Sequence, residues 1–187
     1  MRVFIGIDLD DDVRADLASL CEAIRTGVPA WHPEKWVPAE NLHLTLKFLG
    51  KVEPASLDDI SSALREGLAA QDPFELRVAE PVEAVPVPGR ARMLWTRCDD
   101  TDGRCAVLAR RIDDTLVRFG IEPESRPFVP HITLVRTRRP KAFPGHGAFT
   151  TGRISSLSVR EVTLYSSVLA RSGPIYERIA HITLADR

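Results

Sequence analysis

The sequence has few cysteines, almost no net charge and no long apolar segment. Its three cysteines, Cys21, Cys98 and Cys105, are odd in number and lack C-x-x-C spacing, which disfavours both a disulfide framework and a zinc site. The formal net charge is −1, so any contact with nucleic acid must come from a local patch. No apolar run could span a bilayer, and residues 1–10 lack the features of a signal peptide. We therefore expect a cytoplasmic protein without membrane contacts.

The chain of 187 residues is long enough to bury a substantial core in one domain over residues 1–187. Apolar residues at helical spacing predict helices over 13–27, 54–68 and 105–120, with Asp10 to Asp12 capping the first. Strands are predicted at the two motifs described below, and elsewhere near 2–9, 74–80, 91–98, 159–168 and 175–184. A loop is predicted over 137–152. This mixed order favours the α+β class.

A short motif, His-x-Thr-Leu, occurs at His43 and again at His131, in a chain with only five histidines. Because side chains alternate along a strand, the His and Thr of each motif share one face. If the two strands face one cleft, the site holds two imidazoles and the hydroxyls of Thr45 and Thr133. Two imidazoles can supply a general acid and a general base near neutral pH.

A third copy of the motif begins at His181. His43 and His131 lie 88 residues apart, as an internal duplication would place them, whereas His181 follows only 50 residues later. Pro130 also restricts the residue before it to extended geometry, and Arg136 adds a cation near a possible anion. We therefore expect His43 and His131 to form the pair and His181 to lie on an ordinary closing strand.

Residues 36–50 (WVPAENLHLTLKFLG) and 126–136 (RPFVPHITLVR) resemble the two-histidine phosphoesterase superfamily. They are most similar to its bacterial and archaeal RNA 2′,3′-cyclic phosphodiesterases, once known as 2′-5′ RNA ligases. The resemblance covers nearly the whole chain. It implies a single bilobal domain with a pseudo-twofold arrangement of two antiparallel sheets, outer helices, and a central cleft that carries both motifs.

The resemblance also implies a reaction and its residues. The enzyme would hydrolyse 2′,3′-cyclic phosphate ends to 2′-phosphates without a metal or cofactor, and could also join RNA ends through 2′-5′ linkages. His131 would activate water and His43 would protonate the ribose 3′-oxygen, although sequence alone leaves the two interchangeable. Thr45 and Thr133 would contact phosphate oxygens. The implied partners are RNA with cyclic phosphate termini, including tRNA fragments, or cyclic nucleotides, bound by a monomer.

The residues beside the motifs raise a geometric conflict. The resemblance implies that Phe48 stacks on a base and that Arg136 binds phosphate or base, yet an ideal strand directs both away from the histidines. The same alternation puts Lys47 on the histidine face, where we expect an exposed side chain. A basic group, Arg138, Arg139 and Lys141, follows the second motif and could contact longer RNA.

Two other functions remain open at this point. The apolar segment that ends in Asp8 and Asp10 resembles the start of a magnesium-dependent aspartyl phosphatase, with Asp8 as nucleophile and Asp10 as acid. The aspartates are explained more simply as helix caps. Alternatively, the chain could be a non-catalytic protein that binds RNA ends.

Overall fold

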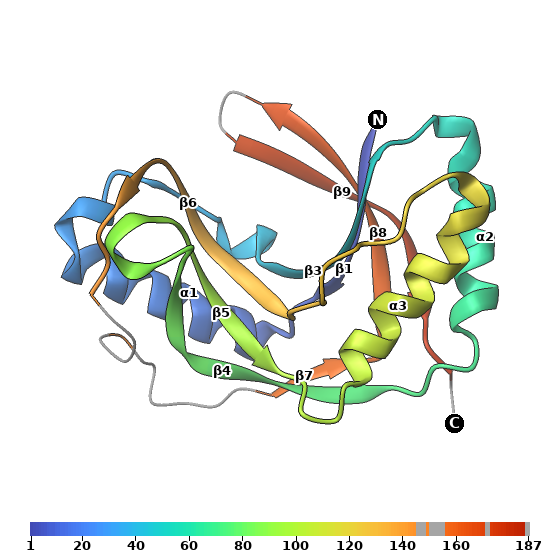
Figure 1. Ribbon diagram of the computed structural model, residues 1–187, viewed down its shortest axis with the longest axis horizontal. Coiled ribbons are helices and arrows are strands. Elements are labelled where there is room, and N and C mark those ends of the chain that lie inside the picture. Colours follow the sequence, from blue (N-terminus) through green and yellow to red (C-terminus); the bar gives the residue numbers. More distant parts are fainter. Residues whose placement is uncertain (145–148, 150–155, 171–172, 186–187) are drawn as a thin grey trace.

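A computed structural model describes residues 1–144, 149, 156–170 and 173–185 (Figure 1). Its helices are α1 (Asp11–Gly27), α2 (Leu57–Leu68) and α3 (Arg104–Leu116). Its strands are β1 (Arg2–Asp8), β2 (Lys35–Trp36), β3 (His43–Lys51), β4 (Phe74–Val85), β5 (Ala91–Asp99), β6 (His131–Lys141), β7 (Ser156–Val159), β8 (Glu161–Ala170) and β9 (Gly173–Thr183).

All strand pairs in the described chain are antiparallel, and they run in the order β7-β4-β5-β6-β3-β1-β8-β9, with β2 paired to β6. The two motif strands, β6 and β3, are neighbours at the centre of this order. They share a single paired position, Leu44 with Ile132. The expected α+β fold is confirmed, with one refinement: the two predicted sheets are continuous through this narrow contact and form one curled sheet.

The helices lie outside the sheet, as expected. In the view of Figure 1, α1 lies behind β4, β5 and β6, and α2 and α3 lie side by side near the other half of the sheet. Each helix buries the apolar stripe that predicted it, for example Leu17 and Ile24 in α1. After α3, a short 3₁₀ turn leads to Gly120, whose φ of +73° is a conformation that glycine adopts readily.

The capping prediction at Asp10 is wrong. Asp10 stands at the N-cap position of α1, but its carboxylate makes no capping hydrogen bond and instead accepts the amide of Ser158 at 3.0 Å. Asp11 and Asp12 do lie in the first turn, where negative charge interacts favourably with the helix dipole. A carboxylate cap occurs at α3, where Asp100 accepts two amides of the first turn.

Several strand boundaries also differ from the predictions. The strand β6 continues to Lys141, so the first five residues of the predicted loop over 137–152 are extended, while much of the remainder lies outside the described residues. The short strands β2 and β7 were not predicted, because two or four residues carry too little periodicity to detect.

In the described chain, no helix is both long and apolar enough to cross a membrane.

A candidate two-histidine active site

The two motif strands meet with local twofold symmetry. Their paired position, Leu44 with Ile132, is the second residue of each motif. Continuing this antiparallel register places His43 level with Thr133 and Thr45 level with His131. The two motifs therefore lie on adjacent strands at the centre of the sheet.

The two imidazoles are held in the same way. The Nδ1 atom of His43 lies 2.7 Å from the carbonyl oxygen of Asn41, and that of His131 lies 2.8 Å from the carbonyl oxygen of Val129. A carbonyl oxygen can only accept, so each Nδ1 carries the proton of its hydrogen bond. The remaining nitrogen, Nε2, is then free to take or give a proton. In His43 it lies 3.0 Å from the Thr45 hydroxyl.

A β-bulge in each motif strand resolves the conflict over Phe48 and Arg136. In the ladder between β1 and β3, Thr45 and Lys47 face consecutive residues, which leaves Leu46 as an extra residue. The ladder between β5 and β6 skips Leu134 in the same way. An extra residue reverses the alternation that follows it. Phe48 and Arg136 are consequently exposed on the histidine side of the sheet, in matching positions.

The same bulge removes Lys47 from the cleft. Our expectation of an exposed side chain was wrong: Lys47 is 8% exposed, and its Nζ lies 2.6 Å from Asp113 Oδ1 on α3. It also donates to the carbonyl of Glu122 at 2.6 Å. The equivalent residue of β6 is the buried Val135. Lys47 thus links β3 to α3 and to the chain at Glu122, which leads toward the second motif.

A cleft of about 480 Å³ opens over the first motif strand. Of the predicted site residues, all but His131 are among those that line it: His43, Thr45, Phe48, Thr133 and Arg136. The guanidinium of Arg136 donates to the Thr133 hydroxyl at 3.4 Å. No carboxylate is among the described residues that line this cleft, whereas Arg2 and Arg136 are, so the cleft is suited to an anion.

Aromatic rings and a carboxylate surround His43. Phe4 and Tyr176 lie 4.9 and 5.3 Å from its ring, measured between centroids. Burial lowers the pKa of His43 below its ordinary value, while the Asn41 carbonyl and the charge of Asp8 act in the opposite direction. Glycine at position 6 allows β1 to lie close to β3, since a Cβ there would lie only 2.9 Å from the Leu44 carbonyl oxygen.

Asp8 is the register partner of His43 on β1 and is tightly held. Its carboxylate accepts from Arg178 at 3.0 and 3.2 Å, from Thr163 at 3.0 Å, and from the Tyr165 hydroxyl. Burial works to raise the pKa of Asp8, but these hydrogen bonds outweigh it and hold the pKa below its usual range. Asp8 therefore presents a fixed negative charge beside the first motif.

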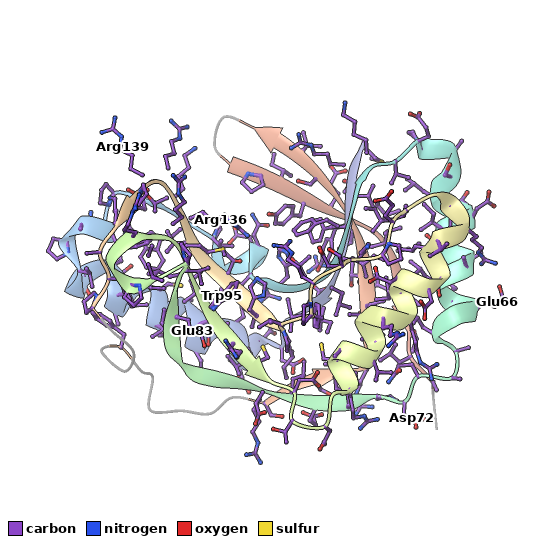
Figure 2. All side chains as sticks on the ribbon, in the orientation of Figure 1. Glu66, Asp72, Glu83, Trp95, Arg136 and Arg139 are labelled. Carbon is purple, nitrogen blue, oxygen red and sulfur yellow. The ribbon has the colours of Figure 1, made fainter. Side chains whose placement is uncertain are left out.

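A tryptophan and a second carboxylate lie behind His131. The Trp95 ring is 4.1 Å from the imidazole, and its Nε1 donates to Glu83 at 2.9 Å. Arg97 pairs with the same carboxylate at 3.0 Å. Burial lowers the pKa of His131, the Val129 carbonyl opposes this, and Arg136 lowers the pKa further. Figure 2 shows Glu83, Trp95 and Arg136 on neighbouring strands of this half of the sheet.

The third motif lies elsewhere. His181 is exposed on β9, with its Nδ1 2.9 Å from Glu161, and it does not line the cleft. Asp8, Glu161 and His181 bring possible metal-ligand atoms within 4.8 Å of one another. The oxygens of Asp8, however, already accept from three side chains, including the Arg178 cation, which disfavours a divalent ion. The same contacts leave Asp8 poorly placed to act as the nucleophile of an aspartyl phosphatase.

Several residues around the histidines were not predicted from the sequence. Phe4 and Arg2 could have been found from the alternation of β1, whose intervening residues are apolar. The contact of Trp95 with His131 was not predicted, because it depends on cross-strand register. Lys141, one of the three basic residues considered for RNA contacts, is instead paired with Glu34 and with the carbonyl of Ala30. Arg138 and Arg139 are exposed, and Figure 2 shows Arg139 projecting outward.

Comparison with known proteins identifies relatives along almost the entire chain. The family described as "LigT like Phosphoesterase" matches residues 7–95 and 98–176. A protein of Methanothermobacter thermautotrophicus named RNA 2′,3′-cyclic phosphodiesterase is 32% identical over 180 residues, covering 94% of this chain and 95% of the relative. An Escherichia coli protein of the same name is 30% identical over 177 residues, covering 94% and 92%.

Solved structures give the same result. The crystal structure of E. coli LigT in complex with 3′-AMP superposes with a TM-score of 0.79 at 28% identity, covering 99% of this chain and 98% of that one. The crystal structure of a Thermus thermophilus protein, TT0787, also has a TM-score of 0.79, at 27% identity and 98% coverage of both chains.

Proposed function

Because the chain belongs to the LigT-like phosphoesterase family, we propose that it is an RNA 2′,3′-cyclic phosphodiesterase that leaves a 2′-phosphate. Residues 1–187 would act as one bilobal unit, with both motif strands contributing to one site. The names of the curated relatives support the reaction class. The observation that carries the proposal is the pair of imidazoles at the centre of the sheet, whose Nδ1 atoms are each held by a backbone carbonyl so that Nε2 is the nitrogen left for proton transfer.

The proposed reaction is an in-line displacement at phosphorus. Nε2 of His131 takes a proton from water as the water oxygen bonds to phosphorus. The bond between phosphorus and the ribose 3′-oxygen breaks, and Nε2 of His43 gives its proton to that oxygen. The 2′-oxygen keeps the phosphoryl group, and solvent resets both imidazoles. General acid and base roles of this kind each contribute about 10²- to 10⁴-fold.

The local charges support this division of roles. The largest charge effect on His43 comes from Asp8, which favours the protonated form required of an acid. The largest charge effect on His131 comes from Arg136, which favours the neutral form required of a base. Burial is the largest influence and lowers the pKa of both histidines, while these charges act on the two residues in opposite directions.

The remaining site residues would bind the phosphate and the nucleoside. The Thr45 and Thr133 hydroxyls would donate to the non-bridging oxygens as negative charge develops on them. Arg136, already in contact with Thr133, would neutralise that charge. Phe48 is 67% exposed beside the cleft and offers an open ring face on which a base can stack.

The test is hydrolysis of adenosine 2′,3′-cyclic phosphate in the presence of EDTA, with the product isomer identified by phosphorus NMR. We expect full activity and adenosine 2′-phosphate as the product. Loss of activity on chelation would refute the metal-independent reaction. A 3′-phosphate product would leave the acid and base pair intact but would reverse the identity of the leaving oxygen.

Ligation would use the same displacement with a different nucleophile. If the 5′-hydroxyl of a second RNA took the place of water, its oxygen would bond to phosphorus and the product would contain a 2′-5′ linkage. The measurement is incubation of an RNA that has a cyclic phosphate terminus with a second RNA that has a free 5′-hydroxyl, including fragments of a tRNA. A joined product that resists a nuclease specific for 3′-5′ linkages would establish the activity.

A second candidate function is a protein that binds RNA ends without turnover, and it is favoured by the same anion-binding cleft. Single-turnover hydrolysis separates it from the enzyme, because a binder would release the cyclic phosphate unchanged.

A further inference from the structure

The cleft extends past the histidines along β1 toward Arg2. Residues 3, 5 and 7 of β1 are buried in the core, so the alternation of the strand turns Arg2 and Phe4 toward the cleft. Arg2 lines the same cavity as His43 and Phe48. Nothing in the proposed reaction uses this arginine, although it is one of the two arginines that line the cavity.

The ladder between β1 and β3 gives the order of groups along the cleft. Thr45 is paired with Gly6, Phe48 with Phe4, and Lys51 with Arg2. Along the two strands, the motif residues are therefore followed first by a pair of aromatic residues and then by a pair of cationic residues. The four residue steps from Gly6 to Arg2 span about 13 Å of strand, and the arginine side chain covers part of this distance.

A terminal nucleotide could reach all three groups. With the cyclic phosphate beside His43 and the base on Phe48, the 5′-carbon, which is on the same face of the ribose as the base, can extend along the strands toward Arg2. Tyr176 of β9 also lines the cleft here, and its ring centroid lies 5.1 Å from that of Phe4. The next group on an RNA chain is the phosphodiester at the 5′-oxygen, which is an anion.

The cationic pair, Arg2 and Lys51, is suited to bind that anion. Gly50 and Ser167 line the cavity beside Arg2, so one neighbour adds no side chain and the other adds a hydroxyl donor. Lys51 is the register partner of Arg2 and supplies a second positive charge on the neighbouring strand. Both cations are exposed, and within the described ranges Arg2 makes no ion pair.

We propose that Arg2 forms a subsite for the 5′-phosphate of the terminal nucleotide, so that the cleft favours a phosphodiester-linked RNA end over a free nucleoside cyclic phosphate. The proposal rests on the function proposed above and adds a determinant of specificity to it. A guanidinium is suited to this role because its planar donors match two phosphate oxygens.

The test compares adenosine 2′,3′-cyclic phosphate with the same compound carrying a 5′-phosphate. In the unmodified protein we expect the 5′-phosphate to raise kcat/KM about tenfold, the value of one partly exposed charge-assisted contact. Arg2→Ala should reduce the ratio between the two substrates to about one, and Arg2→Lys should restore part of it. Arg65→Ala is the matched control, since it removes an exposed arginine on α2 and should keep the full ratio.

Each outcome decides the proposal. A ratio near one in the unmodified protein, or a ratio that survives Arg2→Ala, would overturn it while leaving the proposed hydrolysis intact. If neither compound were hydrolysed, the proposed function would fail instead. Calorimetric titration of the same variants with adenosine 2′-phosphate and adenosine 2′,5′-bisphosphate would then decide whether Arg2 binds the 5′-phosphate.

Discussion

The strands β3 and β6 have nearly the same backbone and different surroundings. Their first seven residues share one pattern of exposure, both contain a bulge at the fourth residue, and both hold an imidazole by a carbonyl two residues earlier. The charges around them differ. Asp8 lies beside His43, whereas the strongest charge acting on His131 is Arg136. In the proposed reaction, the duplicated frame would supply two equivalent proton-transfer groups, and the unequal charges would allow them to take different roles.

Removing either imidazole should have the largest effect. We expect His43→Ala and His131→Ala each to lower kcat by about 10²- to 10⁴-fold, because each removes one proton-transfer group. His181→Ala is the matched control, since it removes an exposed histidine outside the cleft. Steady-state kinetics with circular dichroism as a check of folding would test this. Equal damage from His181→Ala in a folded protein would show that we have paired the wrong histidines.

Lys47 is a buried charge that distinguishes the two strands, since β6 has Val135 in its place. Lys47→Val would make the strands alike but would leave the Asp113 carboxylate without its cation. Removing one partner of a buried ion pair costs about 3–5 kcal/mol of unfolding free energy. Urea unfolding should show this loss, and the double variant Lys47→Val, Asp113→Leu should recover much of it. An unchanged unfolding free energy in the single variant would contradict a structural role for the pair.

Phe48 and Arg136 occupy matching positions after the two bulges, and we propose that they bind different parts of the substrate. We expect Arg136→Ala to lower kcat/KM for adenosine 2′,3′-cyclic phosphate by about 10- to 100-fold, since a charge-assisted contact to the phosphate is lost. Phe48→Ala should raise KM about tenfold with little change in kcat, because a stacking contact is made equally before and during reaction. Phe48→Tyr retains the ring and should behave like the unmodified protein. A loss of kcat in Phe48→Ala would show that the ring also positions the reacting groups.

The pH profile should separate the two carboxylates. Burial lowers the pKa of both histidines, so kcat/KM should be bell-shaped with its maximum below pH 6.5. Asp8→Asn removes a charge that raises the pKa of His43, so the alkaline limb should move to lower pH. Glu83→Gln acts in the same way on His131, so the acid limb should move to lower pH. Each shift should change the rate on its own limb by about two- to fivefold. Movement of the same limb in both variants would contradict the separate roles.

The smallest expected effect concerns Arg138 and Arg139, the eighth and ninth residues of β6, where β3 has Gly50 and Lys51. They should contact only longer RNA. KM for an oligonucleotide should therefore rise more steeply with salt than KM for a cyclic mononucleotide, by about one unit of logarithmic slope per phosphate contact. Replacing both arginines with alanine should reduce this difference. Equal salt slopes for the two substrates would show that these arginines do not contact RNA.

The helices and the motif strands could be predicted from the sequence, whereas the pairing and contacts between strands could not. The helical stripes of α1, α2 and α3 and the paired motifs were visible because they depend on local periodicity. The bulges at Leu46 and Leu134 were not, since a bulge is a property of a strand and its neighbour together. For the same reason Phe48 and Arg136 were assigned to the cleft only by resemblance, and Lys47 was placed on the wrong face. The contact of Trp95 with His131 likewise depends on register between strands that are distant in sequence.

The acid and base roles can be tested most directly by changing the leaving atom. In a 2′,3′-cyclic substrate whose 3′-oxygen is replaced by sulfur, the leaving thiolate needs no proton, because a thiol is far more acidic than a ribose hydroxyl. We predict that His43→Ala is strongly impaired on the oxygen substrate and nearly normal on the sulfur substrate, while His131→Ala is impaired on both. Recovery of His131→Ala instead of His43→Ala, or of neither, would contradict the account.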